Sequence, residues 1–204
     1  MNKKSKGKAR RCFTDEEISE LSSYFDKKIA GDDKGLEIRN YTIIFTALNT
    51  GMRIGEILSW DVEDVWDGKR ALQTSICDET KTNKVRVIEL QEGLRNILQG
   101  YIKTKGYEND VDKPLFRNIN NGRLKYRQTL NIFKKACADC GIRTTLIGCH
   151  SARKTYAKEA LDAGNNNYSN VQKALGHTSI KTTYAYVTFN PKDVSTMIGK
   201  INFA

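Results

Sequence analysis

The stretch Leu175-Gly-His-Thr-Ser-Ile-Lys-Thr-Thr-Tyr-Ala-Tyr186 contains one of the chain's two histidines and, nine positions later, its last tyrosine. A glycine follows the short helix that Val171–Leu175 predicts, and glycine accepts the left-handed backbone of a helix end. Apolar periodicity predicts another helix over Ile180–Val187. His177 is therefore expected in a turn between two helices, with Tyr186 on the second one.

The second histidine stands one helical turn before an arginine, in His150-Ser-Ala-Arg153. Ser151 is expected to cap a helix that runs to Ala163. Toward the N-terminus, periodicity and capping signals predict helices that begin at the capping box Thr14–Glu17, cover Leu36–Leu48 and Arg53–Leu58, run from Leu94 to Gly106, and cover Leu124–Cys140. Ala71–Cys77 and Val85–Leu90 are β-branched and predict a β-hairpin. The expected fold class is mainly α with one small antiparallel β-sheet (α+β).

The charge balance indicates a polyanionic partner. The 204 residues include 34 Lys and Arg against 24 Asp and Glu, which gives a net charge of +10. Residues 1–11 hold six of the basic side chains and no acidic one, so a flexible basic arm is expected there. The sequence shows no secretory signal and no run of about 18 apolar residues, so we expect a cytoplasmic protein without a membrane segment.

The five cysteines are an odd number at irregular spacings, which suits a reducing compartment better than a disulfide framework. Cys137 and Cys140 form a CxxC pair that could make a zinc site with Cys149 and His150. The pair falls inside a helical pattern rather than on a turn, however, and this favours core packing. We expect neither a metal nor a cofactor.

Four motifs along the chain carry chemistry-bearing residues at characteristic spacings. They are Thr50-Gly-Met-Arg53-Ile-Gly-Glu56, Thr80-Lys81-Thr-Asn-Lys84 between the two predicted strands, His150-x-x-Arg153, and Leu175-Gly-His177 with Tyr186. In this order they resemble the signature of the tyrosine recombinase family, also called the phage integrase family. The resemblance runs from about Thr14 to Asn190 and implies the catalytic-domain fold of that family.

The resemblance implies a catalytic set made of Arg53, Lys81, His150, Arg153, His177 and Tyr186, with Glu56 supporting the first arginine. The residue types fit metal-free chemistry on a phosphodiester, because arginine forks match phosphate oxygens and stabilise the added charge of the transition state. A phenol with a pKa of about 10 needs nearby cations or a base, which Arg53, Arg153 and a neutral His150 would supply. Lys81 is the candidate general acid for the leaving 5′-oxygen, and His177 the candidate phosphate contact.

Several assignments have competitors. Lys84 competes with Lys81 as the general acid, and Tyr184 competes with Tyr186, although only Tyr186 has the nine-residue offset from the histidine. Tyr184 is expected to point elsewhere on its helix, with the core as one destination. The second arginine box departs from the family pattern at Ala152 and Lys154, where leucine and histidine are usual.

Three regions are expected: a basic flexible arm (1–13), a tyrosine recombinase catalytic domain (14–190), and a C-terminal tail (191–204). Apolar residues of the tail suit packing within the chain or docking on a neighbouring protomer: Met197, Ile198, Ile201 and Phe203. DNA contacts are expected from four basic residues of one predicted helix: Lys125, Arg127, Lys134 and Lys135. The chain is either a compact family member or an excised catalytic domain.

The resemblance implies a bacterial, phage or mobile-element recombinase that cuts and rejoins double-stranded DNA at a specific site through a 3′-phosphotyrosyl intermediate. It implies a homotetramer in the synaptic complex and a monomer or weak oligomer when free. Two alternatives remain open at this point: relaxation of DNA in the manner of a type IB topoisomerase, and a DNA-binding or architectural protein with a degenerate catalytic scaffold.

Overall fold

The computed structural model describes residues 11–79, 84–145 and 147–187. Lys81, the tail 191–204 and the basic residues of the arm before Arg11 therefore lie outside the described residues. Within these ranges the α-helices are α1 (Asp15–Ile29), α2 (Leu36–Thr50), α3 (Ile54–Ser59), α4 (Glu92–Lys105), α5 (Tyr126–Asp139), α6 (Cys149–Ala163), α7 (Tyr168–Leu175) and α8 (Ile180–Val187). A 3-10 turn covers Val62–Asp64.

The sheet consists of β1 (Thr74–Glu79) and β2 (Lys84–Glu89), which pair antiparallel with Thr74 opposite Glu89 and Ile76 opposite Val87. The mainly helical fold with one small antiparallel sheet confirms the expected class. In the part of the chain that is described, no helix is long and apolar enough to cross a bilayer.

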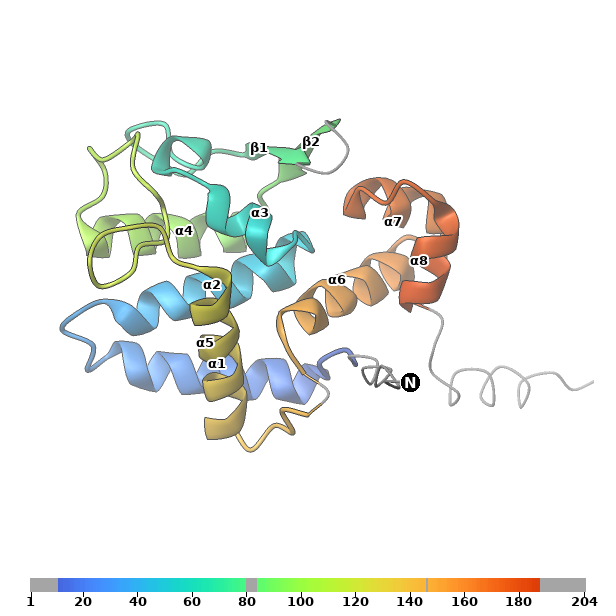
Figure 1. Ribbon diagram of the computed structural model, residues 1–204, viewed down its shortest axis with the longest axis horizontal. Coiled ribbons are helices and arrows are strands. Elements are labelled where there is room, and N and C mark those ends of the chain that lie inside the picture. The colour runs from blue at the N-terminus through green and yellow to red at the C-terminus, as the bar shows by residue number, and fades with distance from the viewer. Residues whose placement is uncertain (1–10, 80–83, 146, 188–204) are drawn as a thin grey trace, which may run out of the picture.

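Helix α2 is the centre of the larger core. Ile43, Ile44 and Ala47 are almost completely buried, and α1, α3, α4, α5 and α6 all pack against the helix (Figure 1). Apolar residues around most of its circumference explain this position. The helix ends at Gly51, whose left-handed φ of 61° and bond from its N–H to the Ala47 carbonyl form the expected stop.

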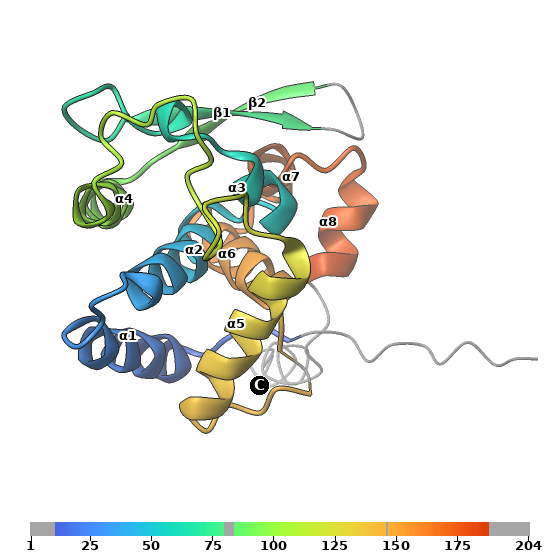
Figure 2. The ribbon, with the colours of Figure 1, turned by 60° about the vertical axis from the view of Figure 1, so that its left-hand side comes forward.

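Helix α6 connects this core to a smaller one. Its Ala152 belongs to the larger cluster, whereas Ala157 and Leu161 pack with Val171 and Leu175 of α7. Figures 1 and 2 show α7 and α8 at one end of the molecule, with α7 beneath the β-hairpin. The His177 motif therefore lies on a small helical unit that must be held in place against the larger body.

Five helix starts differ from the sequence prediction by one to three residues, those of α3, α4, α5, α6 and α7. For α6 and α7 the hydrogen bonds of the first turn give the reason. Helix α6 begins at Cys149, and Ser151 lies within its first turn, where its hydroxyl accepts a hydrogen bond from the Gly148 N–H at 3.2 Å. Helix α7 begins at Tyr168, three residues before Val171, because the Asn167 side chain accepts a hydrogen bond from the Asn170 N–H. The earlier start of α6 places His150 on the helix instead of before it.

Residues 11–13, expected to belong to the arm, pack on the domain. Arg11 pairs with Glu17, the acidic member of the α1 capping box. Phe13 is buried, and its N–H donates to the Thr155 hydroxyl of α6 at 2.8 Å. The start of the chain's described part is therefore fixed to both α1 and α6.

Candidate active site

Arg153 of α6 lies at the centre of the candidate site. Only 3% of the residue is exposed, and its guanidinium donates from Nη1 to the Gly51 carbonyl at 2.7 Å and from Nη2 to the Leu175 carbonyl at 2.6 Å. A buried charge requires such partners, and the carboxyl ends of α2 and α7 supply carbonyls where the helix dipole favours a cation. Arg153 therefore joins the turn before Arg53 to the turn that holds His177.

Arg53 stands at the N-cap of α3 and is fixed by Glu56. One carboxylate oxygen of Glu56 accepts from the Arg53 backbone N–H at 2.8 Å, and the other pairs with Arg53 Nη1 at 2.6 Å. The Glu56 side chain is 9% exposed, whereas that of Arg53 is 40% exposed. The carboxylate thus anchors the arginine from the protein side, while a large part of the guanidinium side chain faces solvent.

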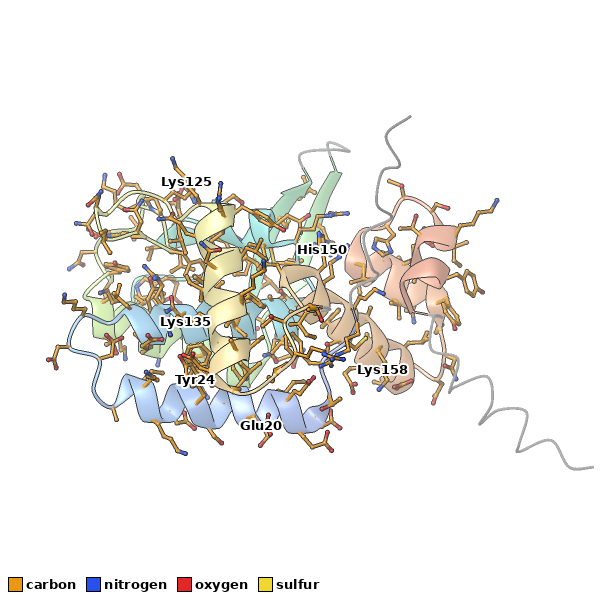
Figure 3. The ribbon with its side chains drawn as sticks, turned by 60° about the horizontal axis from the view of Figure 1, so that its bottom comes forward. Glu20, Tyr24, Lys125, Lys135, His150 and Lys158 are labelled. Carbon is orange, nitrogen blue, oxygen red and sulfur yellow. The ribbon has the colours of Figure 1, made fainter. Side chains whose placement is uncertain are left out.

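His150 lies in the first turn of α6, three residues before Arg153 and therefore on the same face of the helix. The residue is exposed, and Figure 3 shows it at the amino-terminal end of α6. The exposed His150 thus lies one helical turn from the buried Arg153, which contacts the turn before Arg53 and the helix end before His177.

His177 follows α7 and is held by two residues that the sequence did not single out. Gln172 accepts from the His177 N–H at 3.0 Å and donates from its side chain to the His177 carbonyl at 2.9 Å. The ring Nδ1 lies 2.9 Å from the Thr183 hydroxyl, and Thr183 is completely buried on α8. A histidine ring with one nitrogen engaged in this way has a fixed orientation and a favoured tautomer.

The two candidate tyrosines share α8. Tyr184 is 45% exposed and stacks on Tyr168 of α7, with ring centroids 4.3 Å apart. Of the destinations left open for this side chain, it takes a position at the surface and not one in the core, because the α7 ring offers it a partner there. Tyr186 lies in the last turn of α8; its side chain is outside the described set. Because α8 packs on both α6 and α7, the backbone of Tyr186 is carried by a helix that adjoins α6, which holds His150, and α7, which ends two residues before His177.

Arg86 of β2 is a further residue that sequence reasoning missed. Its side chain is 9% exposed; Nη2 lies 3.2 Å from Glu56, and Nη1 donates to the Ala174 carbonyl at the end of α7. Valines flank Arg86 in the sequence, so simple alternation suggests that they face inward. The structure shows the reverse, since Val85 and Val87 are 66% and 61% exposed.

The four basic residues predicted to contact DNA are all exposed on or next to α5, but they differ in their surroundings. Lys135 pairs with Asp139 at 2.9 Å, and Tyr24 of α1 donates to the same carboxylate at 2.8 Å. Lys135 and Tyr24 also line a groove between α1, α2 and α5, whereas Lys125 stands at the opposite end of α5 (Figure 3). Lys135 therefore already has an acidic partner, Asp139, on its own helix.

The cysteine residues fit the interpretation of core packing. Cys137 is 1% exposed, and burial raises the pKa of its thiol to about 12. Cys149 is also buried, while Cys140 is half-buried at the end of α5. Among the described residues, no group of three or more His, Cys, Asp or Glu side chains is arranged to hold a metal ion.

Known proteins resemble this chain in both sequence and fold. The tyrosine recombinase XerC of Caldanaerobacter subterraneus subsp. tengcongensis is 26% identical over 163 residues, which are 79% of this chain and 44% of that protein. The probable integrase/recombinase YoeC of Bacillus subtilis is 28% identical over 173 residues, covering 84% of this chain and 85% of that protein. The crystal structure of the XerH site-specific recombinase in a pre-cleavage complex with its difH substrate matches with a TM-score of 0.71 and 21% identity, over 95% of this chain and 55% of that one.

The chain spans about half the length of the curated XerC relatives that it matches. The family model described as the phage integrase family matches residues 11–193, which include all four motifs. The chain therefore belongs to the phage integrase family.

Proposed function

We propose that the protein is a site-specific recombinase that cleaves and rejoins double-stranded DNA through Tyr186. The observation that carries this proposal is the position of Arg153, whose guanidinium bonds to Gly51 and Leu175 at 2.7 and 2.6 Å. These bonds tie the turn before Arg53 and the turn before His177 to α6, the helix that carries His150 and Arg153. Cations held in fixed positions suit a phosphate group whose charge grows in the transition state.

In the proposed cleavage step, the phenol oxygen of Tyr186 attacks the scissile phosphorus and a phosphotyrosyl bond forms. The bond from phosphorus to O5′ breaks, and the electron pair leaves with that oxygen. His150 takes the phenol proton, and Lys81 supplies a proton to the departing O5′. Attack by a 5′-hydroxyl from another strand reverses these steps, so the phosphodiester is restored without ATP.

Arg53 and Arg153 hold the phosphate oxygens in this scheme, and Glu56 keeps the first arginine in place. His177 donates a hydrogen bond to the phosphate from Nε2. This role requires the Thr183 hydroxyl to donate to Nδ1 across the 2.9 Å contact, which leaves the ring proton on Nε2.

The proposed partner is duplex DNA with a defined site. The surplus of positive charge and the relation to XerH, which was crystallised with its DNA substrate, support this. We further propose that four copies assemble in the synaptic complex, that free protein is a monomer or weak oligomer, and that the tail 191–204 docks on a neighbouring protomer. The region from about Thr14 to Asn190 is the proposed catalytic domain, and the cytoplasm the proposed location.

The experiment starts by capturing the DNA site. Purified protein is incubated with sheared genomic DNA of its source, and fragments that stay attached in SDS are released by protease and sequenced. A duplex with the recovered site, nicked beside the scissile phosphate so that the cleaved end diffuses away, then traps the covalent complex.

Wild-type protein is expected to form an SDS-resistant adduct with this duplex, and Tyr184→Phe is expected to do the same. Tyr186→Phe is expected to bind the duplex with unchanged affinity and to form no adduct. A Tyr186→Phe protein that still forms the adduct contradicts the assignment of the nucleophile. Relaxation of any supercoiled plasmid by monomeric protein, without a preferred site, contradicts recombination and favours a topoisomerase.

A further inference from the structure

Arg86 of β2 connects the β-hairpin to the helix that precedes His177. In the register of the sheet, Arg86 lies opposite Cys77, on the face that Ser75 and Ile88 share. These three neighbours are 2–5% exposed, so this face is turned into the protein. An arginine at such a position must find acceptors for its guanidinium, because a buried cation without partners is costly.

Arg86 finds two acceptors on different elements. Nη2 pairs with Glu56 of α3 at 3.2 Å, and Nη1 donates to the carbonyl of Ala174 on α7. The first acceptor is the carboxylate that also holds Arg53, and the second lies three residues before His177. The planar guanidinium of Arg86 therefore connects Glu56, which holds Arg53, to the helix end before His177.

The adjacent carbonyl on α7 has a similar partner. Leu175, next to Ala174, accepts from Arg153 at 2.6 Å. Two guanidinium groups from different elements thus bind successive carbonyls at the carboxyl end of α7, where the helix dipole favours positive charge. Arg153 ties this end to α6 and α2, and Arg86 ties it to α3 and the sheet.

We propose that Arg86 is a positioning residue that holds the two halves of the phosphate site, Arg53 with Glu56 and the turn of His177, at the separation that catalysis requires. The inference rests on the proposed function, because it concerns the reaction at the same phosphate. Arg86 acts through Glu56 and α7, so its loss displaces the groups that hold the phosphate and leaves DNA binding elsewhere on the surface unchanged.

The test compares Arg86→Gln and Arg86→Lys with wild-type protein on the nicked duplex, at protein concentrations that saturate the DNA. Arg86→Gln is expected to cleave about 10- to 100-fold more slowly, since small misplacements of reacting groups have effects of this size. Arg86→Lys is expected to fall between Arg86→Gln and wild type, because an ammonium keeps the charge but lacks the fork that spans both acceptors. The dissociation constant for the duplex is expected to stay within about twofold.

Arg70→Gln is the matched control. The side chain of Arg70 is 78% exposed and contacts only the nearby Asp67 in the described ion pairs, so this variant is expected to cleave at the wild-type rate. Thermal midpoints of all variants, measured without DNA, confirm that each protein is folded at the assay temperature.

A second substrate separates the phosphate site from the leaving group. In a duplex with sulfur in place of the bridging O5′, the departing thiolate needs no proton, so a general acid is dispensable. Arg86→Gln is expected to remain slow on this duplex, because its defect lies in holding the phosphate. If Arg86→Gln cleaves this duplex at the wild-type rate, the inference is overturned, and Arg86 then acts in the protonation of the leaving oxygen.

Other outcomes of these experiments also test the role of Arg86. Wild-type cleavage by Arg86→Lys shows that charge alone suffices and contradicts the bridging role, and a loss that follows DNA affinity alone contradicts it as well. If wild-type protein forms no adduct, the proposed function fails, whereas an active wild type with an equally active Arg86→Gln refutes only this inference.

Discussion

At the scale of single residues, the buried hydroxyl of Thr183 contacts the imidazole of His177 and fixes the orientation of its ring. Thr183→Val keeps the shape of the side chain and removes the contact with His177 Nδ1, which is 2.9 Å in the structure. We expect cleavage of the nicked duplex to slow by about tenfold, because a His177 ring that is no longer held in one orientation is misplaced toward the phosphate. Thr183→Ser, which keeps the hydroxyl, is expected to retain most of the rate. Equal rates for the two variants contradict this role of the hydroxyl.

Gly51 makes a second residue-scale prediction, on stability. Its φ is +61°, and a Cβ added there comes within 2.3 Å of the Tyr156 ring. Gly51→Ala is therefore expected to lower the free energy of unfolding by about 1–3 kcal/mol, as measured by urea denaturation. Gly55, inside α3, has open space around its added Cβ, so Gly55→Ala is the matched control and is expected to be neutral or mildly stabilising. If Gly51→Ala has the same free energy of unfolding as Gly55→Ala, the expected clash between the added methyl group and the Tyr156 ring is excluded.

At the scale of elements, the start of α1 predicts a pH dependence. The hydrogen bond from Arg11 holds the pKa of Glu17 below its usual range, and the Thr14 N–H adds to this effect. A lowered folded-state pKa means that the stabilisation is present above the unfolded pKa of about 4.3 and is lost as the pH falls through the folded value. Glu17→Gln is expected to lower the thermal midpoint at pH 7, corresponding to about 1 kcal/mol. The difference from wild type should shrink toward pH 3, and a constant difference argues against the ionised pair.

Helix α5 predicts a difference between two adjacent lysines. Lys134 is exposed without a described ion pair, whereas Lys135 is bound to Asp139. Lys134→Gln is expected to weaken DNA binding and to reduce the slope of log affinity against log salt by about 0.9, the value for one phosphate contact. Lys135→Gln is expected to change the slope little. Equal slopes for Lys134→Gln and wild type exclude Lys134 from the DNA interface.

Helices with strong local signals were predictable from the sequence. The capping box at Thr14 and the αL glycines at Gly51, Gly106 and Gly176 stand where the patterns indicated, because these signals act within one helical turn. The start of α6 was not predictable in this way, because the Ser151 hydroxyl accepts a hydrogen bond from the Gly148 N–H within the first turn of the helix. Local capping rules favour a serine before the helix and miss this arrangement.

At the scale of the whole molecule, spacing predicted which residues carry chemistry but not how they are held together. Arg86 escaped notice because its role depends on Glu56 and Ala174, which are 30 and 88 positions away in sequence. The alternation of Val85 and Val87 suggests the wrong face, because the buried face of this sheet carries Arg86 together with Cys77 and Ile88. Contacts between distant elements are set by tertiary packing, which a single sequence does not display.

In the proposed reaction, Tyr186 forms the covalent bond to DNA. The most direct measurement digests the trapped wild-type adduct with protease and nuclease and maps the remaining nucleotide by mass spectrometry. We expect a single modified peptide with a 3′-linked nucleotide on Tyr186. A nucleotide on Tyr184 or on any other residue, or one linked through its 5′-phosphate, contradicts it.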